Sequence, residues 1–369
     1  MERTVVHLIT GLSKGGAETM LYQLLRYQEN HDFQYKVISM GGGHYYEEPL
    51  HELGINVVEL DFISHPLSSF WHICREIKNA DLLCCWMYHA NFVGFLAARL
   101  CRVKRIVWCI RQSNLSSSVN KNRTLKINRI CAQWSKNVSE ILYNGNRARD
   151  AHEAMGYCRD KGFVVDNGCD CDEYIPDASA PESIRSELNI PYERRIILSV
   201  TKDAPVKDIP TFINSFGLTH EQDKGLTAVM CGPGVEVGNE RISSLCREKN
   251  LEIGKDVFLL GMRHDVPKLL AACDLYVLHS AGEAFPNVLL QAMSCGCLCV
   301  TTDVGDARRI LNQDDCVVPP GDATLLAEKM AELLALPKER ADTMRHENRA
   351  RVQERFDIRE IVKQYEEQF

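Results

Sequence analysis

Short apolar runs recur along the chain, and most lead through a polar or glycine-rich stretch into a segment of helical periodicity. Residues 17–27, 209–216 and 323–336 place apolar side chains three and four positions apart, which is typical of a helix with one buried face. Strands that alternate with helices favour a parallel sheet built from βαβ units. We therefore predict an α/β chain with doubly wound sheets. The runs that predict buried strands are residues 5–10, 35–40, 56–60, 81–86, 105–110 and 139–143, followed by 195–200, 227–231, 256–260, 274–278 and 298–302.

The longest apolar run, residues 82–100, includes His89, Asn91 and Arg99, so it predicts a strand and a helix rather than a membrane span. A chain of 369 residues with 45% hydrophobic content is expected to form two domains of ordinary size. The formal net charge of -7 argues against a general nucleic-acid binder.

The cysteines bear on compartment and on metal binding. The start of the chain leads directly into the first predicted strand, and no secretory signal is visible. Sixteen cysteines without such a signal fit a reducing compartment. We therefore expect a cytoplasmic protein, or one at the inner face of the membrane. Because no C-x-x-C pair occurs, a zinc site is not expected, and most cysteines are interpreted as small buried apolar residues.

The loop after residues 274–278 carries one carboxylate, Glu283, and leads into a helix with Pro286 near its first turn. The amides of residues 285–289 are expected to be unpaired at the positive end of that helix, where a phosphate binds well. Glu283 and Gln291 carry oxygens that accept hydrogen bonds from hydroxyls. Phosphate and hydroxyls together suggest a sugar nucleotide. A core helix beside a surface glutamate remains the alternative on these residues alone.

A second polar loop, residues 201–208, follows the strand at 195–200 and contains Lys202 and Lys207. Two cations there can neutralise a diphosphate leaving group without a metal. An ordinary solvated loop is the alternative interpretation.

In the first half, residues 11–16 form a glycine-rich turn after the first strand, but the G-x-G-x-x-G pattern is missing, which weakens a nicotinamide interpretation. His89 follows the strand at 81–86, at the edge where open α/β sheets bind ligands. A satisfied core histidine is the alternative. Arg111 and Asn114, in the loop after residues 105–110, are candidates for binding a phosphate or an acceptor.

Residues 99–136 contain ten cations and no acid. In a chain that is acidic overall, such a segment creates a local positive field. It would attract anionic lipid headgroups or an acceptor phosphate. Alternatively, its second part is a solvated helix face whose apolar side chains point to the core.

The run E-A-F-P-N-V-L-L-Q-A-M at residues 283–293, followed by S-C-G, resembles the E-x7-E signature of retaining GT-B glycosyltransferases of family 4. Ala284 replaces the usual glycine. Gln291 replaces the second glutamate, which keeps an acceptor oxygen and loses the charge. Lys202 replaces the arginine of the family's R-x4-K-D pattern, which loses the bidentate fork.

The resemblance implies two Rossmann-like domains that face each other across a cleft. Residues 1–173 would bind the acceptor and residues 174–350 the nucleotide sugar. Residues 175–181, which are rich in proline, alanine, aspartate and serine, are interpreted as the hinge, and the boundary is expected near residues 172–181. The charged segment 339–365 is expected to be helical. Residues 351–369 are expected to pack back on the first domain through Phe356, Ile361 and Tyr365.

The resemblance also implies residue roles. Glu283 would bind donor sugar hydroxyls, and Lys202 and Lys207 would stabilise the departing diphosphate. The other implied positions are Phe285, Pro286, Asn287 and Val288 at the phosphates, Gln291 at the ribose, Met262 and Arg263 at the base, Gly16 near the donor, His89 at the reacting sugar, and Arg111 and Asn114 at the acceptor.

The implied reaction moves a sugar, with retained configuration, from a nucleotide sugar to a glycan or lipid-linked acceptor in surface polysaccharide or glycolipid synthesis. A UDP-sugar is the favoured donor. No cofactor or metal is expected beyond this co-substrate, and the D-x-D match at residues 170–172 is interpreted as coincidence. Two alternatives remain open: a nucleotide-sugar epimerase of the same fold, and a binding subunit without activity, which Gln291, Ala284 and Lys202 would favour.

Overall fold

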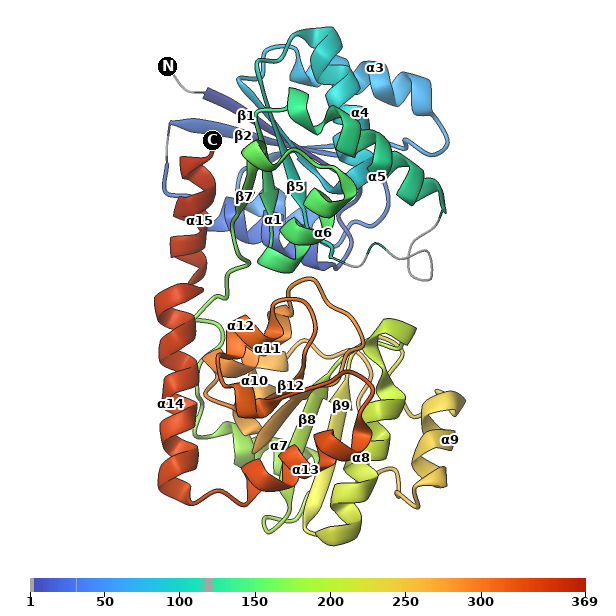
Figure 1. Ribbon diagram of the computed structural model, residues 1–369, viewed down its shortest axis with the longest axis vertical. Coiled ribbons are helices and arrows are strands. Elements are labelled where there is room, and N and C mark those ends of the chain that lie inside the picture. Colours follow the sequence, from blue (N-terminus) through green and yellow to red (C-terminus); the bar gives the residue numbers. More distant parts are fainter. Residues whose placement is uncertain (1–2, 31, 114, 116–121) are drawn as a thin grey trace. The chain divides into compact units, whose positions relative to one another are not determined.

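The computed structural model describes residues 3–30, 32–113, 115 and 122–369, which form two compact units (Figure 1). The first unit runs to Gly168 and includes Ile358–Phe369 at the end of the chain. The second unit is Cys169–Asp357. The unit boundary lies between residues 168 and 169, whereas the sequence prediction placed it between 173 and 174.

The first unit is built on a seven-stranded parallel sheet with the strand order β3-β2-β1-β4-β5-β6-β7. Its strands are β1 (Arg3–Ile9), β2 (Phe33–Ser39), β3 (Asn56–Glu59), β4 (Leu82–Trp86), β5 (Arg105–Ile110), β6 (Glu140–Tyr143) and β7 (Gly162–Val164). Its α-helices are α1 (Gly16–Arg26), α2 (Glu47–Glu52), α3 (Pro66–Ile77), α4 (Met87–Cys101), α5 (Asn122–Trp134), α6 (Asn146–Met155) and α15 (Ile358–Glu367).

Helices cover both faces of this sheet because its strands are apolar on both sides. In β1, Val5 and Ile9 belong to the core beneath α1 and α15, whereas Val6 and Leu8 belong to the core beneath α3, α4 and α5. This alternation follows from the two-residue period of a strand.

The second unit has a six-stranded parallel sheet with the order β10-β9-β8-β11-β12-β13. Its strands are β8 (Arg195–Val200), β9 (Leu226–Cys231), β10 (Val257–Leu259), β11 (Leu275–Leu278), β12 (Leu298–Thr302) and β13 (Val317–Val318). Its α-helices are α7 (Ala180–Leu188), α8 (Ile209–Gln222), α9 (Glu240–Glu248), α10 (Val266–Ala272), α11 (Asn287–Ser294), α12 (Ala307–Leu311), α13 (Ala323–Leu334) and α14 (Lys338–Arg355). Both units are doubly wound and Rossmann-like, so the predicted fold class is confirmed.

Each sheet reverses its strand order once, between β1 and β4 in the first unit and between β8 and β11 in the second. At such a switch point the loops after the two central strands diverge and leave room for a ligand. The loops after β8 and β11 contain the predicted lysines and Glu283, and those after β1 and β4 lead to Gly16 and His89.

The expected helical segment 339–365 is divided, which corrects the prediction. Helix α14 ends at Arg355 and α15 begins at Ile358. The carbonyl of Phe356 accepts a hydrogen bond from the amide of Cys169 at 2.8 Å. This carbonyl is therefore bonded to a segment distant in sequence and not to an amide of a continuing helix.

The prediction that Phe356 packs on the first domain was wrong. Its ring is buried in the core of the second unit, 6.2 Å from the ring of Phe285. Ile361 and Tyr365 do lie in the core of the first unit, beside α1.

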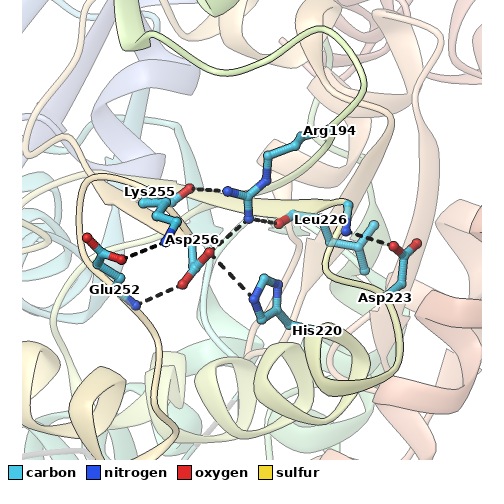
Figure 2. Close-up of polar contacts among 8 residues, drawn as sticks. Arg194, His220, Asp223, Leu226, Glu252, Lys255 and Asp256 are labelled. Atoms are coloured by element: carbon cyan, nitrogen blue, oxygen red, sulfur yellow. Dashed lines mark hydrogen bonds and ion pairs between the residues drawn. The ribbon is translucent and has the colours of Figure 1, made fainter.

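A polar network joins the amino-terminal ends of β8, β9 and β10 in the second unit (Figure 2). The guanidinium of Arg194 donates to Asp256 Oδ1 at 2.9 Å and to the carbonyl of Lys255 at 3.0 Å. The amide of Glu252 donates to the other carboxylate oxygen of Asp256 at 3.0 Å, and Nε2 of His220 lies 3.5 Å from Oδ1. These contacts stabilise the edge of the sheet at which the strands begin. The loops that follow the strands lie at the opposite edge.

Candidate active site

Lys207 and Glu283 meet at the switch point of the second sheet. Lys207 ends a short 3₁₀ turn, Pro205–Lys207, after β8, and Glu283 lies in the loop after β11. The ammonium group of Lys207 donates a hydrogen bond to Oε1 of Glu283, and the hydroxyl of Ser280 donates to the same oxygen at 2.7 Å. Both charged side chains are mostly shielded from solvent, which strengthens their mutual attraction. A cation and an anion therefore lie side by side at the predicted ligand edge.

A buried histidine connects the two loops. Nε2 of His279 lies 2.7 Å from the hydroxyl of Ser199, and Nδ1 lies 3.2 Å from the carbonyl of Asp208. Burial lowers the pKa of His279 to about 4, so the ring is neutral at pH 7. The neutral ring donates from Nδ1 to that carbonyl and accepts from Ser199 at Nε2. Sequence reasoning missed this residue, because a histidine after an apolar strand carries no signal of its partners.

The turn after β12 supports the Glu283 loop from another side. Gly305 has a φ of 49°, and a Cβ atom there would overlap the carbonyl oxygens of Ala284 and, at 2.7 Å, Glu283. The hydroxyl of Thr302 donates to the carbonyl of Ser280 at 2.7 Å. Gly305 thus allows close approach to the loop that carries Glu283.

Helix α11 begins at Asn287, directly after Pro286, and no side chain caps its N-terminus. The amide of Leu289 donates to the carbonyl of Pro286 at 3.0 Å, so this member of the predicted 285–289 amide set is already bonded. The ring of Phe285 is buried, which leaves only its backbone for a ligand. Asn287 and Gln291 are four positions apart and share a face of the helix, as a ligand that extends along α11 would require.

Lys202 begins the loop after β8, and its side chain is exposed. Within the described part of the chain it makes no ion pair. Its neighbour Asp203 is held by hydrogen bonds from Asn239 and Arg241. The structure therefore brings Lys207 to Glu283 but leaves Lys202 directed at solvent.

The two predicted base contacts differ in their surroundings. Met262 is exposed after β10. The guanidinium of Arg263 binds Glu187 at 2.6 Å and Asp265 at 2.7 Å, and these two carboxylates raise its pKa. Because its side chain is engaged twice, a base at this position would meet the backbone of residues 262–263, as the resemblance also implies.

In the first unit, His89 lies in the first turn of α4 and is half-buried. Burial and the nearby positive charge of Arg123 lower its pKa, so its ring is neutral at pH 7. Gly16 begins α1, and the carboxylate of Glu18 folds back against Gly15 so closely that a Cβ atom there would overlap it. Burial raises the pKa of Glu18.

Arg111 is held within the first unit. Its guanidinium donates to the hydroxyl of Tyr365 at 2.6 Å and to the side chain of Asn167, and it lies over the ring of Trp86 at 5.3 Å. Arg111 thus ties β5 to the C-terminal helix, which leaves little of it for an acceptor. Asn114, the other predicted acceptor contact, lies outside the described residues.

The potential metal ligands of the described residues lie outside the loops of the predicted site. Oδ1 of Asp170 accepts hydrogen bonds from the amides of Asp172 and Glu173, both at 3.0 Å, so the D-x-D match forms a turn. In the described ranges, one group of three side chains has ligand atoms close enough for a metal: His44, Glu47 and Glu59, which are largely exposed. None of these three residues belongs to the loops described above.

Two family models match the chain: Glycosyltransferase Family 4 over residues 14–173 and Glycosyl transferases group 1 over residues 181–351. The putative glycosyltransferase EpsF of Bacillus subtilis is 25% identical, with 82% of this chain and 79% of that protein covered. The N-acetyl-alpha-D-glucosaminyl L-malate synthase of Bacillus anthracis is 33% identical over 50% of this chain and 47% of its own length. The crystal structure of Anabaena Alr3699/HepE in complex with UDP and glucose superposes with a TM-score of 0.86, at 22% identity and 99% coverage of both chains.

Proposed function

Because the chain belongs to the group 1 glycosyltransferases of family 4, we propose that it transfers a sugar, with retained anomeric configuration, from a UDP-sugar to a lipid-linked saccharide. The contact between Lys207 and Glu283 carries this proposal. A nucleotide sugar presents a diphosphate next to sugar hydroxyls, and the switch point presents a cation next to a carboxylate. The two patterns are complementary in charge and in hydrogen bonding.

In the proposed reaction, the bond between the anomeric carbon and the diphosphate oxygen breaks, and negative charge develops on the departing phosphate. Lys207 and the N-terminus of α11 stabilise that charge, with Lys202 turning in from solvent. Glu283 accepts hydrogen bonds from the donor sugar, and Gln291 accepts from the ribose. The acceptor hydroxyl forms the new bond to the anomeric carbon on the face that the diphosphate leaves, and its proton passes to the departing phosphate oxygen. The positive charge in this scheme comes from lysines and helix amides, so it requires no metal.

The relatives support the choice of substrates. One structural relative is described in complex with UDP-glucose. An Escherichia coli relative, 24% identical over 62% of this chain, is named a UDP-Gal:alpha-D-GlcNAc-diphosphoundecaprenol alpha-1,3-galactosyltransferase. A Campylobacter jejuni relative is also named for a diphospho-undecaprenol acceptor. We extend both chemistries, a uridine diphosphate donor and a polyprenyl diphosphate acceptor, to this chain as proposals.

A panel of UDP-, GDP-, ADP- and TDP-sugars, read by thermal shift, tests the donor. A ligand at 100 times its Kd stabilises the folded state by about 2.7 kcal/mol, so a matching donor raises the melting temperature clearly. We expect UDP-sugars to give the largest shift. A larger shift with GDP-sugars, or none with any donor, would contradict the proposal.

Transfer is then measured with the best donor and polyprenyl diphosphate saccharides, and the anomeric configuration of the product is read by NMR. Retained configuration is expected. An acceptor-free reaction that converts the UDP-sugar would instead identify an epimerase. Donor binding without turnover across a broad acceptor set would identify a subunit without activity, the alternative that Gln291 and Ala284 favour.

A further inference from the structure

Helix α3 presents large apolar side chains on its outer face. Ile63, just before the helix, is 92% exposed, Leu67 is 78% exposed and Trp71 is 62% exposed. Leu67 and Trp71 are four positions apart and share one face of α3, and Ile63 lies in the turn that leads into the helix. The opposite face of α3 is already buried, through Ile73 and Ile77. The core of the first unit therefore does not explain these exposed side chains.

The neighbouring helix α4 also carries exposed apolar side chains. The thiol of Cys101, at the end of α4, donates to the carbonyl of Cys74 in α3 at 3.3 Å, so the two helices are adjacent there. Figure 1 also shows α3 beside α4. Leu96 and Leu100 are exposed on α4, again four positions apart. Exposed apolar side chains gathered on two adjacent helices mark a candidate interaction surface.

Most charges around this surface are positive, although the exposed Asp61 lies two residues before Ile63. Arg75 in α3 and Lys78 just after it are exposed, as are Arg99 in α4 and Arg102 just after that helix. The one acid of α3, Glu76, is engaged by Lys36 at 2.9 Å and also contacts Arg75. From residue 82 to residue 139 the sequence contains no aspartate or glutamate. An apolar surface with a cationic margin and no free acid on its own helix is complementary to an anionic lipid surface.

We propose that α3 and the end of α4 dock the protein on an anionic lipid bilayer. Ile63, Leu67 and Trp71 enter the interface between headgroups and acyl chains, and Arg99 and Arg102 contact lipid phosphates. An indole ring at this depth keeps its N–H near water and its carbons in the apolar layer. The proposal rests on the proposed function in one respect: a lipid-linked acceptor is held in a membrane, where the docked protein would meet it. Among the described helices, none is long and apolar enough to span a bilayer.

Trp71 supplies a local probe for the test. Of the four tryptophans, Trp86 and Trp108 are fully buried, and Trp134 stacks on Phe92 and Phe95. A blue shift of tryptophan emission on adding phosphatidylglycerol-containing vesicles therefore reports on Trp71. We expect this shift with anionic vesicles and not with phosphatidylcholine alone. In the Trp71→Phe variant the shift disappears while sedimentation with vesicles remains.

Two double variants separate the apolar and charged contributions. Leu67→Ser with Trp71→Ser, and Arg99→Glu with Arg102→Glu, should each weaken vesicle binding by at least about tenfold, the second only at low salt. Matched controls are Val237→Ser and Arg247→Glu, which alter exposed residues of the second unit and should leave vesicle binding unchanged.

Three outcomes would overturn the docking proposal. The first is that the wild-type protein does not bind anionic vesicles, and the second is that the double variants bind them as well as the wild type does. The third is that the wild-type protein self-associates and the apolar double variant does not, which would assign the surface to a second copy of the chain. Thermal stabilisation by UDP-sugars is measured on the same samples. Intact donor stabilisation without vesicle binding contradicts the docking alone, and vesicle binding without donor stabilisation contradicts the proposed function alone.

Discussion

The ammonium group of Lys207 and the carboxylate of Glu283 are bonded although the two residues lie 76 positions apart in the chain. They meet because β8 and β11 are neighbours in the sheet and their following loops emerge at the same edge. The amide of Ala281 donates to the carbonyl of Val206 at 2.9 Å, which fixes one loop against the other. The pair is thus prepared by the fold, and a bound donor would redirect both partners toward the ligand.

Glu283→Ala and Lys207→Ala should each lower the rate of transfer by at least about 10²-fold, a typical loss for a preorganised electrostatic contact. Steady-state kinetics with saturating donor measures the effect. The matched control is the exposed pair of Lys255 and Glu252, 2.9 Å apart in the same unit (Figure 2). Alanine at either of those positions should leave transfer unchanged. A near-normal rate in Glu283→Ala or Lys207→Ala would remove that residue from the site.

Gln291→Glu should tighten UDP binding several-fold, because a carboxylate accepts hydrogen bonds from ribose hydroxyls more strongly than a neutral amide does. Gln291→Ala should weaken it. Isothermal titration with UDP measures both. Ala284→Gly serves as a comparison that restores the other departure from the family pattern without adding charge. If all three variants bind UDP like the wild type, residue 291 does not contact the nucleotide.

Gly305→Ala should lower transfer more than it lowers stability. Its Cβ would push against the backbone at Glu283 and Ala284, so the carboxylate would leave its position beside Lys207. Gly321→Ala is the matched control, since Gly321 also has a positive φ, of 79°, but has open space at its Cβ position. Both variants share the backbone strain, and only the first displaces the loop. Equal transfer rates in the two would show that the steric contact is unimportant.

Asp256→Ala should destabilise the second unit by about 3 kcal/mol, because it leaves the buried guanidinium of Arg194 without its carboxylate. Urea denaturation measures this loss. Transfer per folded molecule should stay near normal, since the network lies at the opposite edge of the sheet from Lys207 and Glu283. A large loss of transfer in a fully folded Asp256→Ala variant would contradict this separation of roles.

Stability should fall as the pH is lowered from about 6.5 to 4. Burial lowers the pKa of His279 to about 4 in the folded protein from its ordinary value of 6.5, so the unfolded chain binds more protons in this window. The pKa shift corresponds to roughly 3 kcal/mol of unfolding free energy for this one group, and this contribution is lost once the pH has fallen below about 4. His279→Gln should flatten the pH dependence of unfolding of the second unit. An unchanged slope would mean that the ring is not buried as a neutral group.

Local sequence was sufficient for the strands and for the loops of the candidate site. A buried parallel strand is a continuous apolar run, so strands such as Arg105–Ile110 and Arg195–Val200 were predicted at their observed bounds. The polar residues that interrupt the pattern after a strand, Lys207 and Glu283 among them, marked the ligand edge. The short strand β13 was missed, because two valines make no pattern.

The sequence by itself thus determined two doubly wound units, the position of the ligand loops and the chemical groups on them, because these depend on periodicities within a few residues. Only the tertiary structure decided which groups meet: that Lys207 bonds Glu283, that Arg111 and Arg263 are engaged by internal partners, and that Phe356 packs in the second unit. It also left Leu67 and Trp71 exposed on a helix whose opposite face is buried. For each engaged side chain the partner lies far away in the chain. The sequence next to a side chain does not specify which distant residue will neutralise its charge or cover its apolar surface.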